Sequence, residues 1–253
     1  MYIDTHAHLT MPEYDDLAEV ISRAKQSGIE NIINASFDIE SSKKSVQLAE
    51  KNDFIYAAVG IHPHDADKVD EKTILEIKNL VKHVKVVAIG ETGLDYFYNK
   101  SSKEAQKSAF RKFLSLAQEI NKPVIIHCRD AQSDVISIMR EENKGTLRGV
   151  FHCFAGDYEL IKFALEIDFY ISYTGIATFK KAQNIKENIL KTPIENLLLE
   201  TDCPYLAPEP FRGKRNEPAY VKYIAEAIAQ IKGLPVEEIA QKTTANARKL
   251  FKI

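Results

Sequence analysis

Short apolar stretches alternate along the chain with longer segments in which apolar residues recur at helical spacing. Several of the short stretches are almost continuously apolar, such as Val84–Ile89 and Val124–Ile126. Such runs are typical of parallel strands that are buried on both faces. The expected strands are Tyr2–Leu9, Glu30–Ala35, Phe54–His62, Val84–Glu91, Pro123–Arg129, Gly149–Phe154, Phe169–Thr174 and Asn196–Asp202.

Helical patterns occupy the segments between these strands. Phe110, Phe113 and Leu114 recur at helical spacing, and Ser101 with Glu104 predicts a capping box in front of them. The other expected helices are Tyr14–Ser27, Ile39–Lys51, Glu71–Lys82, Asp130–Glu142, Tyr158–Glu166, Lys180–Leu190, one around Val221–Ile228, Val236–Gln241 and a short last one at Ala245–Phe251.

Eight strands, each followed by a helix, imply an α/β fold of the (β/α)8 TIM-barrel type. A doubly wound open sheet is the alternative. The 253 residues suffice for one large barrel, so we expect a single domain over residues 1–253, although two smaller domains would also fit that length.

Five of the expected strands end in a side chain of a type that binds metals. His6 and His8 are two residues apart on a strand, so they point to the same face. The predicted metal ligands are His6, His8, Glu91, His127, His152 and Asp202. A closed barrel would bring them to one mouth at the C-terminal ends of its strands, whereas an open sheet would leave the edge strands apart. The ligand distribution therefore favours the barrel.

Four imidazoles and two carboxylates exceed the four ligands of a closed structural zinc site. They suit two divalent cations that share a carboxylate and a water. We expect Glu91 to bridge the cations, and Asp202 to bind one of them and accept a proton from the attacking water. Zinc, manganese, iron and loosely held magnesium all remain candidates.

Several nearby residues are candidates for supporting the site. Glu200 has the parity of Asp202 one layer deeper, where it would orient a ligand histidine. Asp4 is placed either for such a role or for a separate buried hydrogen-bond network. Asp95 lies further into its loop and is expected to make local hydrogen bonds. The cysteines, Cys128, Cys153 and Cys203, each follow a predicted ligand and are expected to point away as small buried residues.

Five residues are candidate substrate contacts. His62 ends the third strand and would either touch substrate at the rim or fix its loop. Arg129 shares the parity of His127 and would either hold a phosphate or pair with Asp134. Arg212 and Lys214, with Arg215, lie in a proline-rich loop after the last strand, where solvated loop charge is the alternative reading.

Composition restricts the partners. With a net charge of −2, the protein is not basic enough to coat duplex DNA. We therefore expect a nucleic-acid substrate to be bound locally, at a chain end or in a single strand. The odd cysteine count favours a reducing cytoplasm. We expect no signal peptide, no membrane span and no obligatory protein partner.

These motifs together resemble the TatD family of metal-dependent deoxyribonucleases, within the amidohydrolase-like TIM barrels. The segments that carry the resemblance are Asp4–Leu9, Gly60–His64, Gly90–Asp95, Pro123–Asp134, Phe151–Gly156, Thr174–Gly175, Leu199–Tyr205 and Arg212–Pro218. The resemblance implies the same six metal ligands and a nuclease activity on DNA.

We therefore predict a metal-dependent hydrolase that cleaves DNA phosphodiester bonds with a metal-activated water. The alternative is an amidohydrolase-type enzyme that cleaves an amide or ester in a small anionic substrate. A third hypothesis is a barrel that only binds a partner, which the complete ligand set disfavours.

Overall fold

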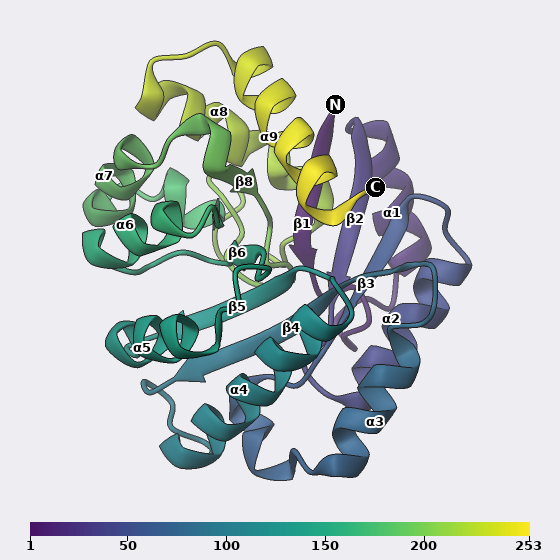
Figure 1. The fold of residues 1–253 in the computed structure, drawn as a ribbon. Helices are drawn as coiled ribbons and strands as arrows, with labels where there is room; N and C mark the ends of the chain where they lie inside the picture. The colour runs from purple at the N-terminus through teal and green to yellow at the C-terminus, as the bar shows by residue number, and fades with distance from the viewer.

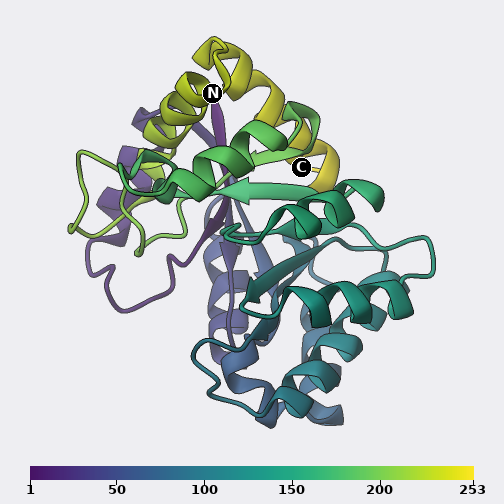
Figure 2. The same cartoon turned by 90° about the vertical axis from the view of Figure 1, so that its left-hand side faces the viewer.

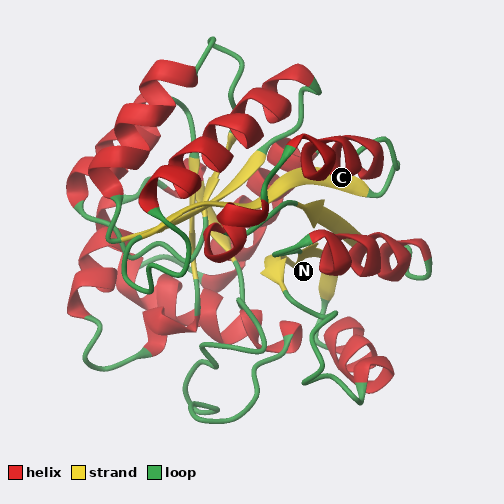
Figure 3. Cartoon of the chain, turned by 90° about the horizontal axis from the view of Figure 1, so that it is seen from below, coloured by secondary structure: helices red, strands yellow, loops and turns green.

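A computed structural model of the protein describes all residues 1–253 and places eight parallel strands in one sheet with the order β1 to β8. The strands are β1 (Tyr2–Ala7), β2 (Ile29–Ala35), β3 (Ile55–Val59), β4 (Val86–Asp95), β5 (Val124–Arg129), β6 (Gly149–Phe151), β7 (Tyr170–Tyr173) and β8 (Leu197–Leu199). The helices surround these strands, as Figures 1 and 3 show.

The sheet closes between its first and last members. The backbone N–H of Asp202 donates to the carbonyl of His6 at 2.9 Å, and the N–H of His8 donates to the carbonyl of Cys203 at 2.9 Å. Ala7 and Cys203 form a parallel bridge. The predicted TIM barrel is therefore confirmed, and the doubly wound open sheet is wrong.

Several strand boundaries differ from prediction: β1 ends at Ala7 and β3 at Val59, before His8 and His62. β4 continues past Glu91 to Asp95, whereas β6 and β8 end before His152 and Asp202. Cys153 and Asp202 adopt φ angles of 43° and 55°. This left-handed backbone cannot continue a strand, so the ligands after β6 and β8 lie in turns.

Nine α-helices follow the strands. They are α1 (Leu17–Gln26), α2 (Ile39–Glu50), α3 (Glu71–Leu80), α4 (Lys103–Glu119), α5 (Gln132–Glu142), α6 (Tyr158–Glu166), α7 (Gln183–Lys191), α8 (Val221–Lys232) and α9 (Val236–Phe251). Short 3-10 helices lie at η1 (Pro63–Lys68), η2 (Gly175–Thr178), η3 (Ile194–Asn196) and η4 (Pro218–Tyr220). No helix combines the length and the apolar composition that a bilayer span requires.

Two details of the helix prediction are wrong. Ser102, not Ser101, caps α4 by accepting a hydrogen bond from the N–H of Ala105. The two last helices form one helix, because the polar stretch between them stays helical and Thr243 donates its hydroxyl back to the carbonyl of Ile239. The polar residues interrupt the apolar periodicity of the sequence, but the helix continues through them.

The barrel is closed at the end where its strands begin. An apolar cluster there takes residues from β1 to β8 and from the end of α9: Ile3, Ile33, Ala58, Val87, Ala88, Ile125, Val150, Tyr170, Leu198, Ala247, Leu250 and Phe251. α9 also binds the N-terminus, because Thr244 donates to the carbonyl of Met1; the two termini accordingly lie near each other in Figures 1 and 2. Only the opposite end, where the strands finish, is left for a site.

Candidate metal centre

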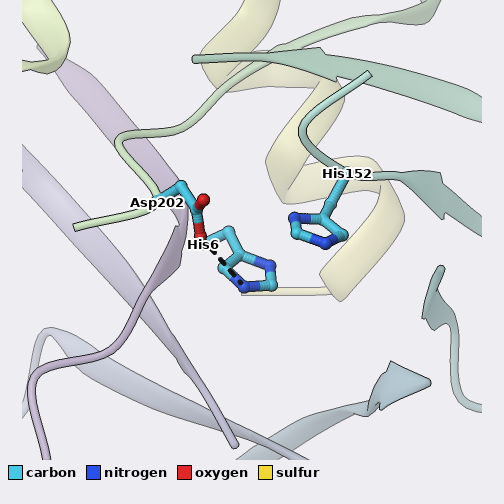
Figure 4. Close-up of side chains that lie close together, drawn as sticks. All are labelled: His6, His152 and Asp202. Atoms are coloured by element: carbon cyan, nitrogen blue, oxygen red, sulfur yellow. Dashed lines mark ion pairs between the residues drawn. The ribbon is translucent and has the colours of Figure 1, made fainter. Parts of the chain in front are cut away.

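All six predicted ligands gather at that opposite end. Figure 4 shows three of them, His6 from β1, His152 after β6 and Asp202 after β8, pointing toward one another although they are far apart in the sequence. Three overlapping groups have the geometry to hold a cation: His6, His152 and Asp202; His6, His8 and Glu91; and His62, Glu91 and His127.

The first part of the centre is built on the two histidines of the opening motif. Their Nε2 atoms lie only 3.1 Å apart. Glu91 Oε2 is 3.4 Å from the Nε2 of His6, and Asp202 Oδ1 is 3.4 Å from the Nε2 of His8. Two imidazole nitrogens that face each other among carboxylate oxygens form the donor set of a divalent transition metal. The residues therefore fit the cofactor that the sequence implies.

The second part of the centre surrounds the other oxygen of Glu91. Glu91 Oε1 lies 2.8 Å from His127 Nδ1, 2.7 Å from His152 Nε2 and 3.4 Å from His62 Nε2. One carboxylate thus faces two sets of imidazoles, one set with each oxygen. This arrangement is the one that a bridging ligand between two cations needs.

His62 is closer to the centre than its predicted role as a rim contact required. It shares a potential metal group with Glu91 and His127. Burial lowers the pKa of His62 to about 4, so its ring is neutral at pH 7, as a metal ligand must be. The sequence did contain a signal: His62 closes an apolar strand, just as the predicted ligands do.

The carboxylates of the centre are ionised. Burial by itself would raise the pKa of Glu91, but the charge of His152 and the hydrogen bonds from His127 and His152 together hold it well below its usual value. Burial also opposes ionisation of Asp202, but the hydrogen bond with His8 and the other neighbouring histidines together outweigh that effect and lower its pKa. Both side chains therefore present negative oxygens to a cation.

Asp95 is a supporting residue whose contact with the centre was missed. It accepts the N–H of Tyr98 at 2.9 Å, the local bond that was expected. Its Oδ2 also lies 3.0 Å from His127 Nε2 and 3.2 Å from His64 Nε2. An ionised carboxylate only accepts hydrogen bonds, so His127 donates its Nε2–H to Asp95, and Nδ1, which faces Glu91, is the nitrogen that could bind a cation after losing its proton. The longer β4 creates this contact.

Glu200 and Asp4 hold the backbone around the ligands. Glu200 Oε1 accepts the N–H of Cys153 at 2.5 Å and lies 3.6 Å from His152 Nδ1, so it fixes the turn that carries this ligand. Asp4 accepts the N–H and the hydroxyl of Thr201 at 2.9 and 2.6 Å. Asp4 therefore belongs to a buried network that joins β1 to the segment after β8.

The candidate substrate contacts other than His62 lie outside the cluster. The guanidinium of Arg129 packs on Phe97, 4.0 Å from the ring centroid, and that of Arg212 packs on Phe179 at 4.3 Å. Lys214 is exposed. Arg215 forms an ion pair with Asp16 at 2.7 Å, so it is engaged with the loop before α1.

The cysteines are all free, and none belongs to a potential metal group. Only Cys203 is fully buried, whereas Cys128 and Cys153 are half-buried, so the expectation of three buried cysteines was wrong for two. Burial raises the pKa of Cys128 and of Cys203 to about 12, which keeps both as thiols at pH 7.

A parallel barrel with a histidine–carboxylate centre at the C-terminal ends of its strands defines a class of metal-dependent hydrolases. Comparison with known proteins gives the family. The model of TatD related DNase matches residues 3–252. An uncharacterized metal-dependent hydrolase of Bacillus subtilis, YabD, is 50% identical over the full length of both chains. The chain belongs to the TatD family of metal-dependent hydrolases.

Two further relatives are similar over nearly their whole length. A protein of Edwardsiella piscicida named 3'-5' ssDNA/RNA exonuclease TatD is 34% identical, with 99% of each chain covered. The crystal structure of the TatD homologue YjjV from Escherichia coli K12 superimposes with a TM-score of 0.93 at 29% identity, covering 100% of this chain and 98% of that one. The family resemblance predicted from the motifs is therefore confirmed.

Proposed function

We propose that this chain cleaves phosphodiester bonds of DNA, in a single strand or at a chain end, with two divalent cations in the centre described above. The observation that carries the proposal is Glu91, whose two oxygens face two separate sets of imidazoles. The name of the Edwardsiella piscicida relative supports a single-stranded nucleic acid as substrate. The net charge of −2 argues against a grip on long duplex DNA.

The ligand roles follow from the distances. His6 and His8, with Asp202, would hold one cation, and His127 and His152 would hold the other, with Glu91 shared between them. Because four of the six predicted ligands are imidazoles, zinc and manganese suit the site better than magnesium, which prefers oxygen ligands and several waters.

The protein's own groups prepare the reaction. When bound, the cations would neutralise charge that develops on the phosphoryl oxygens and would make water a stronger acid. Asp202 is the proposed proton acceptor, because its carboxylate is ionised and 13% of its side chain is exposed at the mouth. The Glu91 side chain is 5% exposed. We propose that it fixes the position of one set of ligands relative to the other, because it faces both.

The remaining expectations stay proposals. We propose that residues 1–253 act as one catalytic domain without an obligatory protein partner, and that the enzyme works in the cytoplasm, a compartment in which its three free cysteines would stay reduced. We also propose that Arg212 and Lys214 contact the phosphates of the substrate, since neither forms an ion pair with the rest of the chain.

The decisive experiment measures cleavage of end-labelled single-stranded and duplex oligonucleotides with added Mn²⁺ or Zn²⁺. We expect metal-dependent cleavage that excess EDTA abolishes and that His127→Ala lowers by at least about 100-fold, the loss typical of an essential metal-site or electrostatic group. His83→Ala is the matched control, because His83 pairs with Glu50 on the surface at 3.0 Å. Undiminished cleavage in EDTA would discard the proposal.

A panel of N-acyl amino acids and lactones tests the amide or ester alternative. The same ligands would serve attack on a carbonyl carbon, so the centre alone does not separate the two chemistries. Hydrolysis of a panel member together with inert oligonucleotides would transfer the assignment to that alternative.

A further inference from the structure

Two neighbouring aromatic rings stand in solvent beside the metal centre. Phe97 and Tyr98 follow Asp95, the last residue of β4, and their exposed fractions are 56% and 54%. Their ring centroids lie 4.9 Å apart with the planes perpendicular. Exposing two large rings in succession costs hydrophobic free energy. Because these rings border the candidate active site, their exposure indicates a binding function.

One cation lies against both rings. The guanidinium carbon of Arg129, the last residue of β5, lies 4.0 Å from the centroid of Phe97 and 4.8 Å from that of Tyr98. The acid that was its possible partner, Asp134, is bound to Lys107 at 2.7 Å instead. Arg129 therefore keeps its charge available to an anion, and the surface is both aromatic and positive.

Asp95 connects this surface rigidly to the centre. One of its oxygens accepts the N–H of Tyr98 at 2.9 Å, and the other lies 3.0 Å from Nε2 of His127. The backbone of the loop is also tied to β5, because the N–H of Tyr96 donates to the carbonyl of Arg129 at 2.9 Å. A group that packs on the rings is thus held one short loop away from a predicted metal ligand.

We infer that Phe97, Tyr98 and Arg129 form a stacking subsite for one unpaired nucleobase of the strand whose phosphodiester lies in the centre. The inference rests on the proposed function and narrows its substrate. Every nucleobase offers a flat face to an aromatic ring, and a guanidinium adds an attraction to the base and to a neighbouring phosphate.

The subsite selects against duplex DNA. In a double helix both faces of an internal base are covered by its neighbours, so exposing one face for Phe97 requires unstacking. A base in a single strand or at a chain end has no such requirement. The rings do not read base identity, so we expect little dependence on sequence.

The test is a scan with abasic sites. Single-stranded oligonucleotides, each with one abasic residue at a successive position from the cleaved end, are cleaved by the wild-type holoenzyme and by Phe97→Leu, Phe97→Tyr and Phe54→Leu variants. The leucine variant keeps apolar bulk without a flat ring, and the tyrosine variant keeps the ring. Phe54 is the control, because its ring packs under Lys25 at 4.7 Å just before β3, at the opposite end of the barrel.

For the wild type we expect an abasic residue at one particular position to raise KM by about 10-fold, the typical contribution of one stacked base. Phe97→Leu should raise KM on the intact strand by a similar factor, with kcat nearly unchanged, and should lose the response to that abasic position. Phe97→Tyr should restore it, and Phe54→Leu should behave like the wild type.

The outcomes separate the two proposals. Normal metal-dependent cleavage with a flat abasic scan, or with an unchanged KM in Phe97→Leu, overturns the stacking subsite and leaves the nuclease proposal standing. Failure of the wild type to cleave any oligonucleotide in the presence of metal overturns the nuclease proposal, and the subsite falls with it.

Discussion

Loading the centre with cations should stabilise the fold, and this effect can be measured without any substrate. His6 and His8 bring two imidazole nitrogens to within 3.1 Å of each other, next to the carboxylates of Glu91 and Asp202. A cation that binds all these donors binds only the folded chain, since the donors come from distant parts of the sequence. Binding therefore shifts the unfolding equilibrium toward the native state.

The size of the shift follows from linkage. A single cation at about 100 times its Kd adds about 2.7 kcal/mol to the free energy of unfolding. For a chain of this size each kcal/mol raises Tm by about 2 to 4 °C, so one occupied site should raise Tm by about 5 to 11 °C. Occupancy of a second site would add a comparable increment.

Differential scanning calorimetry of the EDTA-treated protein, titrated with Zn²⁺ or Mn²⁺, measures this shift. Glu91→Gln should lose most of it, because the amide keeps the shape of the side chain but removes the charge that faces both sets of imidazoles. Glu76→Gln, which changes an exposed carboxylate paired with Lys43, should keep it. The reasoning would be refuted if saturating metal left the Tm of the wild type unchanged, or if metal raised the Tm of the two variants equally.

Three further predictions test the surroundings of the centre. Asp95→Asn should weaken metal affinity by about 10- to 100-fold in isothermal titration calorimetry, because it removes the negative charge and leaves one oxygen for the two donors, Tyr98 N–H and His127 Nε2–H, that the carboxylate serves; an unchanged affinity would show that this contact is dispensable. Gly93→Ala should destabilise the protein by about 1 to 3 kcal/mol in urea unfolding, because its Cβ would lie 2.0 Å from the carbonyl oxygen of His127, and wild-type stability would contradict that packing. Tyr14→Phe should cost about 1 kcal/mol, since the hydroxyl donates to the carbonyl of Asn216 at 2.7 Å; an unaltered midpoint in the same assay would exclude a role for this bond in anchoring the loop.

The sequence predicted the ring of strands and the convergence of its ligands because both depend on simple periodicities. Buried parallel strands are apolar runs, and a ligand at the end of each run must reach the mouth of a barrel. The backbone beyond the strand ends was harder to predict from the sequence. Asp202 reaches the centre from a left-handed backbone conformation at φ 55°, so strand parity predicted its position near the other histidines and carboxylates for an incomplete reason.

The missed contacts have a common cause. Strand parity concerns one strand at a time, whereas Asp95 and His62 acquire their positions from neighbouring strands. Asp95 reaches His127 only because β4 runs four residues beyond Glu91 and stays paired with β5 as far as Arg129. A pattern along one segment cannot specify such pairing length, because it depends on the partner strand.

Glycines explain how this side of the barrel can be so crowded with ligands. A Cβ on Gly60 would lie 2.8 Å from the backbone of Gly90, and one on Gly90 would lie 2.7 Å from Cβ of Ile125. The missing side chains let β3, β4 and β5 approach closely at the level of the centre.

That approach is what places a carboxylate within reach of histidines on both sides. Glu91 follows Gly90 directly and lies between His62, after β3, and His127, on β5, at 3.4 and 2.8 Å. A larger residue at either glycine would move a strand outward and lengthen these distances before it touched any ligand. Gly60 and Gly90 therefore serve the candidate metal centre through the backbone, by setting the spacing of the strands that carry its donors.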